Sequence, residues 1–146
     1  MVNAANASLL PVGGACGAIH RAAGPELAQE YRVLGECPTG DAELTRGYRL
    51  VARYVIHAVG PVWKGGNDGE LALLASCYRR RQRDYYDGLP SISTGIYGYP
   101  IELAANVAVT TVRNSIAAFS PIRDVIFCCC SPSDLAVFQQ RLAEAR

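Results

Sequence analysis

Hydrophobic and polar positions along the chain follow two alternating periods. A helical period of three to four residues covers residues 15–34, 70–86, 101–119 and 132–145. Short β-branched or apolar runs typical of strands cover residues 42–48, 54–59, 89–93 and 123–130. Gly24 and Pro25 divide the first helical segment into two helices, and Gly60 with Pro61 ends a strand. This alternation of strands and helices predicts an α/β sandwich.

Two of the strand-like segments are apolar along nearly their whole length. Residues 54–59 form a run suited to a central position in a covered sheet. Residues 123–130 end in three consecutive cysteines, Cys128 to Cys130, whose side chains would point alternately to opposite faces of a strand. We therefore expect a buried strand there and interpret these cysteines as small buried hydrophobic residues.

Length and charge narrow the class of protein. The chain has 146 residues, half of them hydrophobic, which suffices for one compact core and predicts a single domain over residues 1–146. A net charge of +1, from 14 basic and 13 acidic residues, argues against nucleic acid or a membrane surface as partner. The basic run at residues 79–83 is interpreted as a solvated helix face. Neither a signal peptide nor an apolar run of roughly 20 residues is found, which predicts a cytoplasmic protein.

The cysteines and histidines do not form a metal-binding pattern. The sequence contains no C-x-x-C pair, Cys37 and Cys77 are isolated, and only His20 and His57 are available to complete a site. The sequence therefore predicts no metal centre.

Two loops punctuated by glycine precede helix-like segments. The first runs from Asn3 to Gly14 and the second from Ser93 to Pro100. Glycine permits close approach of the backbone, and the unpaired N–H groups at a helix N-terminus favour negative charge. The two loops therefore predict a phosphate-containing ligand held between two backbone cradles.

Five strings in a fixed order carry a resemblance: VNAAN (2–6), GAIHRAAGP (17–25), CPTG (37–40), VIHAVGPVW (55–63) and ISTGIYGYP (92–100). With these strings the chain resembles the macrodomain family, in its MacroD-type branch, over nearly its whole length. The resemblance implies a three-layer α/β/α macrodomain with a mixed central sheet and a cleft for ADP-ribose. It also implies hydrolysis of O-acetyl-ADP-ribose or of mono-ADP-ribose attached to proteins, with no metal cofactor.

The resemblance implies roles for residues of the first loop. Asn6 matches the asparagine that hydrogen-bonds the distal ribose, and Asn3 matches the residue that holds the loop in shape. The alternative for each is an Asx-type turn without a ligand role; we favour the ligand for Asn6 and the turn for Asn3. The phosphate-proximal glycines of this loop are Gly13, Gly14 and Gly17.

The resemblance also implies roles for residues of the second loop. The residues whose backbone would meet the diphosphate are Ser93, Thr94, Gly95, Ile96 and Tyr97. Tyr97 is expected to close over the distal ribose, and Tyr99 is interpreted as a packing residue. His20 matches a histidine near the ribose, but a hydrogen-bonded core histidine is an equal alternative. His57 lies inside the central strand and is interpreted as a core residue.

The first loop departs from the branch at a position important for catalysis. The branch has GGGGVDG where this chain has PVGGACG at residues 11–17, so Cys16 stands where the aspartate would be. That carboxylate is thought to orient or deprotonate the attacking water, and loss of such a base commonly costs on the order of 10²- to 10⁴-fold in rate. A thiolate acts more readily as a nucleophile than as a base toward water. Turnover is therefore more affected than binding.

Other departures concern the adenine half of the implied site. The strands that precede the Asn3 loop in the family, and the acidic residue that reads adenine, are absent from this sequence. Ser131 and Pro132 follow the last predicted strand, where the family often has an aromatic residue, and the link between Cys77 and Ser93 is short. We expect weaker adenine recognition and an exposed sheet edge that lowers stability or favours self-association.

Two classes of function follow from these residues. The first is a hydrolase with the candidate catalytic residues Asn6, Cys16, His20 and Tyr97. The second is a non-catalytic ADP-ribose-binding module in which the cysteine leaves the bond intact. A globular α/β domain without a nucleotide ligand would require both glycine loops to be incidental turns. We favour the hydrolase because the other MacroD-like residues are present, and restoring aspartate at position 16 would separate the classes.

Overall fold

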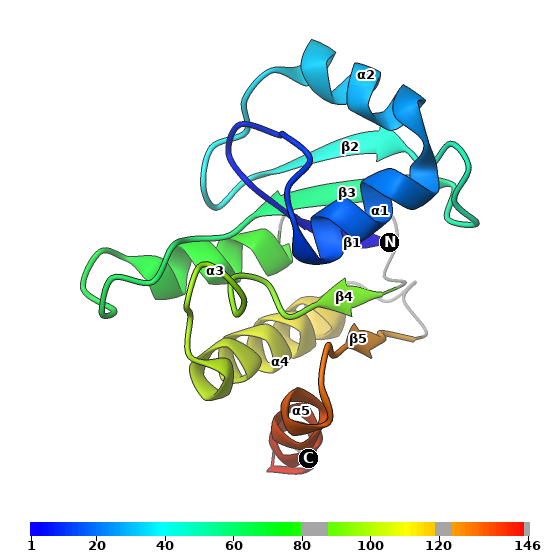
Figure 1. The fold of residues 1–146 in the computed structure, drawn as a ribbon. Helices are drawn as coiled ribbons and strands as arrows, with labels where there is room; N and C mark the ends of the chain where they lie inside the picture. The colour runs from blue at the N-terminus through cyan, green and yellow to red at the C-terminus, as the bar shows by residue number, and fades with distance from the viewer. Residues whose placement is uncertain (80–87, 119–123, 145–146) are drawn as a thin grey trace.

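The computed structural model describes residues 1–79, 88–118 and 124–144 and has an α/β fold (Figure 1). Its described strands are β1 (Val2–Ala5), β2 (Ala42–Arg46), β3 (Tyr54–Val59), β4 (Leu89–Pro90) and β5 (Phe127–Cys128). Its described helices are α1 (Gly14–Ala23), α2 (Pro25–Leu34), α3 (Glu70–Arg79), α4 (Ile101–Ala118) and α5 (Pro132–Glu144). None of these helices combines the length and the apolar character that crossing a bilayer requires.

The strands form a mixed arrangement around β3. β1 pairs with β3 in parallel and β2 pairs with it antiparallel, so the order is β1-β3-β2. β4 and β5 form a parallel pair, and the N–H of Val2 in β1 donates to the carbonyl of Gly88 just before β4. In the register of β1 and β3, Asn3 lies opposite His57. Pairing therefore places two polar residues side by side in the sheet.

Helices cover both faces of this arrangement (Figure 1). α1 and α2 lie on one face, and α3 and α4 lie on the other. One apolar cluster joins Leu27 to Val55, and a larger cluster joins Leu74 to Ile56. β3 is buried from Val55 to Val59, as its continuous apolar run predicts. The predicted three-layer α/β/α fold with a mixed sheet is confirmed.

The predicted division of the first helical segment is confirmed at Gly24. α1 ends at Ala23 and α2 begins at Pro25, because Gly24 adopts a φ of 91°, which favours glycine and interrupts the helix. Pro25 then occupies the first helical position, where no intrahelical hydrogen bond requires its missing N–H.

Two strands differ from their predicted extents. The sequence predicts a loop from Asn3, whereas the structure has β1 at Val2–Ala5. Alanine and asparagine have little preference for strands, so this strand depends on its pairing with β3. The strand predicted over residues 89–93 is only Leu89–Pro90, because Ser93 adopts a φ of 67° and the chain turns there.

The prediction of a buried last strand is wrong. Exposure alternates along this segment: Ile126, Cys128 and Cys130 are exposed, while Phe127 and Cys129 pack partly against the core. A continuous apolar run does not reveal which face of a strand meets solvent. The interpretation of the cysteines as buried is therefore corrected for Cys128 and Cys130.

Some predicted features lie outside the described residues. They are the part of the third helix beyond Arg79, residues 80–87 of the following link, and the segment ends at residues 119, 123 and 145. The run of arginines is therefore described only at Arg79, which is exposed, as expected for a solvated helix face.

Candidate functional site

The two glycine-punctuated loops lie at one edge of the strands. In Figure 1 the segments that follow β1, β3 and β4 all leave on the side away from the N-terminus. The first loop leads from β1 to α1, and the second leads from β4 to α4. Ligands of open α/β sheets bind in the crevice outside the carboxyl ends of parallel strands, and β1 and β3 are parallel. This edge is the candidate site.

The first loop, residues 6–13, is held by its own asparagine. The Asn6 Nδ2 donates to the carbonyl of Leu10 at 2.7 Å, and the N–H of Leu10 donates to Asn6 Oδ1 at 3.3 Å. Leu9 anchors the loop, because its side chain is buried in a small cluster with Tyr31. In this structure the Asn6 amide therefore has the turn-forming role that was the alternative, and its contact with a ribose stays a prediction.

The start of α1 has the properties of an anion-binding helix terminus. Its N-cap residue is Gly13, which has no side chain to satisfy the first N–H groups, and its first turn contains no acidic residue. Residues 11–15 are exposed. A helix N-terminus carries about half a positive charge and leaves its first N–H groups without intrahelical partners, so this one favours a negatively charged ligand.

Gly17 allows the first loop to pack on α1. A Cβ at this position would lie 2.3 Å from the carbonyl oxygen of Val12 and 3.2 Å from Arg21 Nη1. A Cβ at Gly13 would meet nothing within 4 Å. Close approach therefore requires glycine at position 17, whereas a φ of 63° favours it at Gly14. The contact of these glycines with a diphosphate stays a prediction.

Asn3 lies in β1 and belongs to a buried hydrogen-bond network. Its Nδ2 lies 3.0 Å from His57 Nδ1, 3.2 Å from the Tyr31 hydroxyl and 3.5 Å from Cys16 Sγ. The Tyr31 hydroxyl lies 2.6 Å from His57 Nδ1. The Asx turn expected at Asn3 is therefore wrong, because its amide connects β1 with α1, α2 and β3 instead of closing a local turn.

Thr45 in β2 determines where His57 carries its proton. The Thr45 hydroxyl donates to the carbonyl of Arg46 and lies 2.8 Å from His57 Nε2, so it accepts from Nε2–H. His57 Nδ1 is then an acceptor for the hydroxyl of Tyr31. Burial, and then the charges of His20 and the N-terminus, lower the pKa of His57 to about 3. As expected, His57 is a core residue, and its ring is neutral at physiological pH.

Cys16 lies in the first turn of α1 with its side chain buried. The residue is 2% exposed, and Sγ accepts a hydrogen bond from Asn3 Nδ2. Gly13 and Gly14, which are exposed, lie shortly before it at the helix start, separated from it by Ala15. The thiol therefore belongs to the buried network beneath the helix start, while the surface above it is formed by backbone.

His20 lies one turn further along α1, and its ring nitrogens are unpaired. The ring packs edge-on against Tyr31, with centroids 4.6 Å apart, and it is 8% exposed. Neither ring nitrogen has a hydrogen-bond partner in the described part of the chain. Burial lowers the pKa of His20. The hydrogen-bonded core histidine, one of the two alternatives, is thus not what the described residues form.

The second loop consists of nested turns. The N–H of Tyr99 donates to the carbonyl of Ser93 at 3.0 Å, and the N–H of Gly98 donates to the carbonyl of Gly95 at 2.9 Å. Ile96, at the tip, is 88% exposed. The turns hold the backbone of the tip in a compact loop just before α4, which is the form expected for a phosphate cradle.

The rest of the second loop is tied to the segment that follows β3. The side chain of Ser93 packs so closely on Gly60 that a Cβ there would lie 2.1 Å from Ser93 Oγ. Thr94 Oγ1 donates to the carbonyl of Ser91, just before the loop. Tyr97 is half-buried, and its carbonyl accepts from the N–H of Trp63 at 2.8 Å. The position of Tyr97 therefore depends on the segment around Trp63.

Sequence reasoning identified Tyr99 correctly and missed other residues of the site. Tyr99 is buried, and its ring lies 4.6 Å from that of Trp63, so its packing role is confirmed. Tyr31 and Thr45 complete the Asn3 network without any local signal, because their partners are distant in sequence. Glu70 does have a signal, since it is an acidic residue that opens a helix after a glycine-rich stretch.

The site offers backbone N–H, amide and imidazole groups. Within residues 1–79, 88–118 and 124–144, no three histidine, cysteine, aspartate or glutamate side chains gather to hold a metal ion. Backbone donors at a helix start suit a phosphate group, and amide or imidazole groups suit hydroxyls. The arrangement is therefore suited to a ligand that carries both phosphate and sugar hydroxyl groups.

A family model described as "Macro domain" matches residues 2–108. The chain is 58% identical over 149 residues to macro domain-containing protein CT2219 of Chlorobaculum tepidum, covering 98% of this chain and 87% of that protein. It is also 47% identical over 152 residues to the ADP-ribose glycohydrolase MACROD2 of Xenopus laevis. That match covers 99% of this chain but 36% of the Xenopus protein.

Solved structures are similar over almost the whole chain. A mutant macrodomain of Oceanobacillus iheyensis has a TM-score of 0.91 and 39% identity, covering 99% of this chain and 83% of that chain. The Trypanosoma brucei macrodomain in complex with ADP-ribose has a TM-score of 0.85 and 34% identity, covering 97% and 62%. The fold is thus shared with these proteins.

Proposed function

The chain belongs to the macrodomain family, and we propose that it binds ADP-ribose at the edge formed by its two glycine-punctuated loops. One observation carries this proposal: α1 begins at an exposed glycine with no acidic residue in its first turn. This helix start is therefore suited to a diphosphate. The Trypanosoma brucei macrodomain, similar over 97% of this chain, was solved with ADP-ribose.

The diphosphate would lie between the start of α1 and the tip of the second loop. On one side it would meet the backbone at Gly13 and Gly14, and Gly17 keeps the first loop close to the helix. On the other side it would meet backbone N–H groups of residues 93–97, whose turns are closed by hydrogen bonds within the loop. Backbone donors of this kind bind an anion without a nearby lysine or arginine.

The distal ribose would lie beside Asn6, His20 and Tyr97. The amide of Asn6 offers a donor and an acceptor to vicinal hydroxyls if it exchanges its bonds to Leu10. The unpaired ring nitrogens of His20 offer a further donor and acceptor. Tyr97 extends from the second loop, so a ribose held by these three residues would join both loops.

We further propose that the chain hydrolyses O-acetyl-ADP-ribose or mono-ADP-ribose attached to protein. The similarity to an ADP-ribose glycohydrolase supports this proposal. The two loops would stabilise phosphate charge in the transition state. The imidazole of His20 is the candidate proton acceptor for the attacking water, because burial lowers its pKa and favours the neutral form.

A second candidate is a non-catalytic ADP-ribose-binding module, and Cys16 favours it. Its thiol stands where the branch has an aspartate, is buried, and is hydrogen-bonded to Asn3. A buried, hydrogen-bonded thiol is poorly suited to deprotonating water. Both candidates require the same binding site and differ only in turnover.

Calorimetric titration with ADP-ribose, with AMP and ribose 5-phosphate as controls, tests binding. Turnover of O-acetyl-ADP-ribose by the natural chain and by Cys16→Asp then separates the candidates, with Cys16→Asn as the control of similar size without a carboxylate. A hydrolase turns over as it stands. A binding module gains activity only with aspartate, on the order of 10²-fold or more, at similar affinity. Failure of a folded sample to bind ADP-ribose would contradict both.

A further inference from the structure

The segment between β3 and α3 is a third glycine-rich loop, and it is built around one carboxylate. Residues 64–69 are all exposed, so the loop has no apolar interior of its own. Glu70, which follows them as the first residue of α3, is 1% exposed. A buried carboxylate beneath an exposed polar loop requires partners, because an unpaired buried charge is strongly unfavourable.

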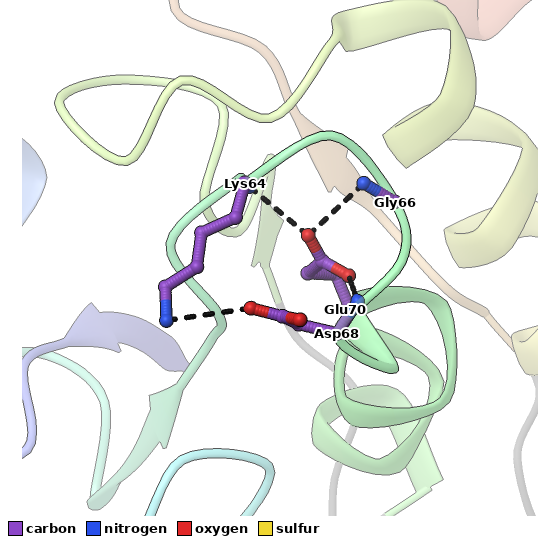
Figure 2. Close-up of polar contacts among 4 residues, drawn as sticks. All are labelled: Lys64, Gly66, Asp68 and Glu70. Atoms are coloured by element: carbon purple, nitrogen blue, oxygen red, sulfur yellow. Dashed lines mark hydrogen bonds and ion pairs between the residues drawn. The ribbon is translucent and has the colours of Figure 1, made fainter.

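The partners of Glu70 are backbone N–H groups of the loop itself (Figure 2). Oε1 accepts from the N–H of Lys64 at 3.0 Å and from that of Gly66 at 3.1 Å, and Oε2 accepts from the N–H of Asp68 at 2.7 Å. Its own backbone N–H, followed by these three donors, lowers the pKa of Glu70 to about 2, although burial opposes this shift. The carboxylate is ionised at neutral pH and fills the concave side of the loop.

Glycine makes this wrapped conformation possible. Gly65, Gly66 and Gly69 adopt φ values of 108°, 89° and 77°, which favour glycine. A Cβ at Gly66 would also lie 2.9 Å from the ring of Trp63. The loop is therefore folded tightly between the carboxylate of Glu70 and the indole of Trp63.

Trp63 connects this loop to the second loop of the candidate site. Its backbone N–H donates to the carbonyl of Tyr97 at 2.8 Å, and the centroid of its ring lies 4.6 Å from the ring centroid of Tyr99. The contacts reach both sides of Gly98, where the second loop turns with a φ of 67°. A shift of Trp63 would therefore move the part of the second loop that faces the ligand edge.

We propose that Glu70 is a positioning residue for the ligand site: its carboxylate holds residues 64–69 in place, and Trp63 transmits that position to Tyr97. This inference rests on the proposed function, because it takes the second loop to be the phosphate cradle. Glu70 touches no ligand in this account. It acts as a built-in anion that closes one glycine-rich loop and thereby supports another.

The test replaces Glu70 with glutamine, which keeps the shape of the side chain but turns one acceptor into a donor facing a backbone N–H. Asp68→Asn is the matched control, because it removes the other carboxylate of the loop, whose ion pair with Lys64 spans 3.5 Å on the surface. Trp63 is the single tryptophan of the chain, so tryptophan emission reports on the surroundings of this one side chain. Amide hydrogen exchange follows residues 64–68 and 93–99 without any ligand.

In Glu70→Gln we expect faster exchange in both loops, altered Trp63 emission, and ADP-ribose binding weakened roughly tenfold. In Asp68→Asn we expect all three readouts to match the natural chain. Unchanged exchange at residues 93–99 together with unchanged Trp63 emission in Glu70→Gln would overturn the inference. If the natural chain does not bind ADP-ribose, the proposed function fails, whereas exchange and fluorescence still decide the positioning role.

Gly66→Ala provides a second route if Glu70→Gln does not fold. It keeps the carboxylate and presses a methyl group against the indole of Trp63. We expect it to raise exchange at residues 93–99 and to shift the Trp63 emission. A folded Gly66→Ala variant with neither change would contradict transmission through Trp63.

Discussion

The loop before α1 and the loop before α3 share a sequence pattern and have opposite chemistry. Both are rich in glycine and both lead directly into a helix. α1 starts at exposed Gly13 and Gly14 with no acidic residue in its first turn, whereas α3 starts with the buried carboxylate of Glu70. A glycine-rich loop before a helix therefore indicates an anion site only after the helix's own first turn has been examined.

This difference assigns separate tasks to the two loops. Three N–H groups of the loop before α3 already donate to the Glu70 carboxylate, so this loop is a fixed support. The start of α1 has no such internal anion, so it is suited to one supplied by a ligand. The support contacts the ligand edge through the backbone of Trp63.

Giving α1 an acid of its own should remove the difference between the two helix starts. Ala15 is exposed in the first turn of α1, so Ala15→Glu places a negative charge where the diphosphate is expected. We expect ADP-ribose affinity to fall about 100-fold or more, because the glutamate carboxylate and the diphosphate, both negative, repel each other at close range. The free energy of unfolding should stay constant or rise by about 0.3–1 kcal/mol, because an acid favours a helix start.

The matched control for this experiment is Ala15→Gln, which has nearly the same shape without the charge. Calorimetric titration of both variants separates repulsion from a steric effect. Equal affinities for the glutamate and glutamine variants would contradict an open anion site at α1.

As the pH falls, acid should destabilise the two regions one after the other, first the buried network under α1 and then the loop before α3. In the unfolded chain His57 takes up a proton near pH 6.5, whereas the folded ring does so only near pH 3. The unfolded state therefore binds more protons between these values, and the free energy of unfolding falls by about 1.4 kcal/mol per pH unit as the pH decreases. His20, whose pKa is also lowered, acts in the same direction.

Glu70 adds a second loss only at lower pH. Its carboxyl group takes up a proton near pH 4.5 when unfolded and near pH 2 when folded, so its stabilisation is complete above pH 4.5 and declines below it. Denaturant unfolding between pH 7 and pH 3 should show both phases. His57→Gln should reduce the first phase, leaving the part due to His20, and should keep the second. Equal stability of the natural chain at pH 7 and pH 5 would rule out the neutral buried histidine.

A methyl group at Gly17 in α1 and at Gly13, the N-cap of that helix, should distinguish a packing glycine from an exposed one. In Gly17→Ala the new Cβ meets the Val12 carbonyl at 2.3 Å, and overpacking of this kind costs about 1–3 kcal/mol. The displaced loop should also weaken ADP-ribose binding. Gly13→Ala, whose Cβ meets nothing within 4 Å, is the control, and its thermal midpoint should be close to that of the natural chain. Similar midpoints for both variants would contradict the close packing of the loop on α1.

Local patterns predicted the elements whose structure depends on near neighbours. The break at Gly24 and Pro25 and the buried run of β3 follow from backbone preference and continuous hydrophobicity, and both were found as predicted. β1 was missed because Val2–Ala5 has little strand preference and is stabilised by pairing with β3, more than fifty residues away in sequence. The exposure of Cys128 was missed because hydrophobicity does not show which side of a strand is covered.

The features of the candidate site also fall into those with a local sequence signal and those that depend on distant residues. The glycine loops were identified from sequence, because glycine and helix starts are local signals. The buried position of Cys16 and the bonds of Asn3 to Tyr31 and His57 were not, because they join four elements. The role of Glu70 could be predicted only in part. Its hydrogen-bond partners lie within six residues, which is a local signal, but they reach it through positive φ values of glycines, which the sequence allows without requiring them.

Titration of the ¹⁵N-labelled chain with ADP-ribose, followed by NMR at single backbone amides, tests the separation of the two helix starts most directly. We expect the amides of residues 13–17 and 93–98 to shift on binding, while the Gly66 and Asp68 amides, which already donate to Glu70, change little. Shifts concentrated at residues 64–68, with residues 13–17 unchanged, would contradict it.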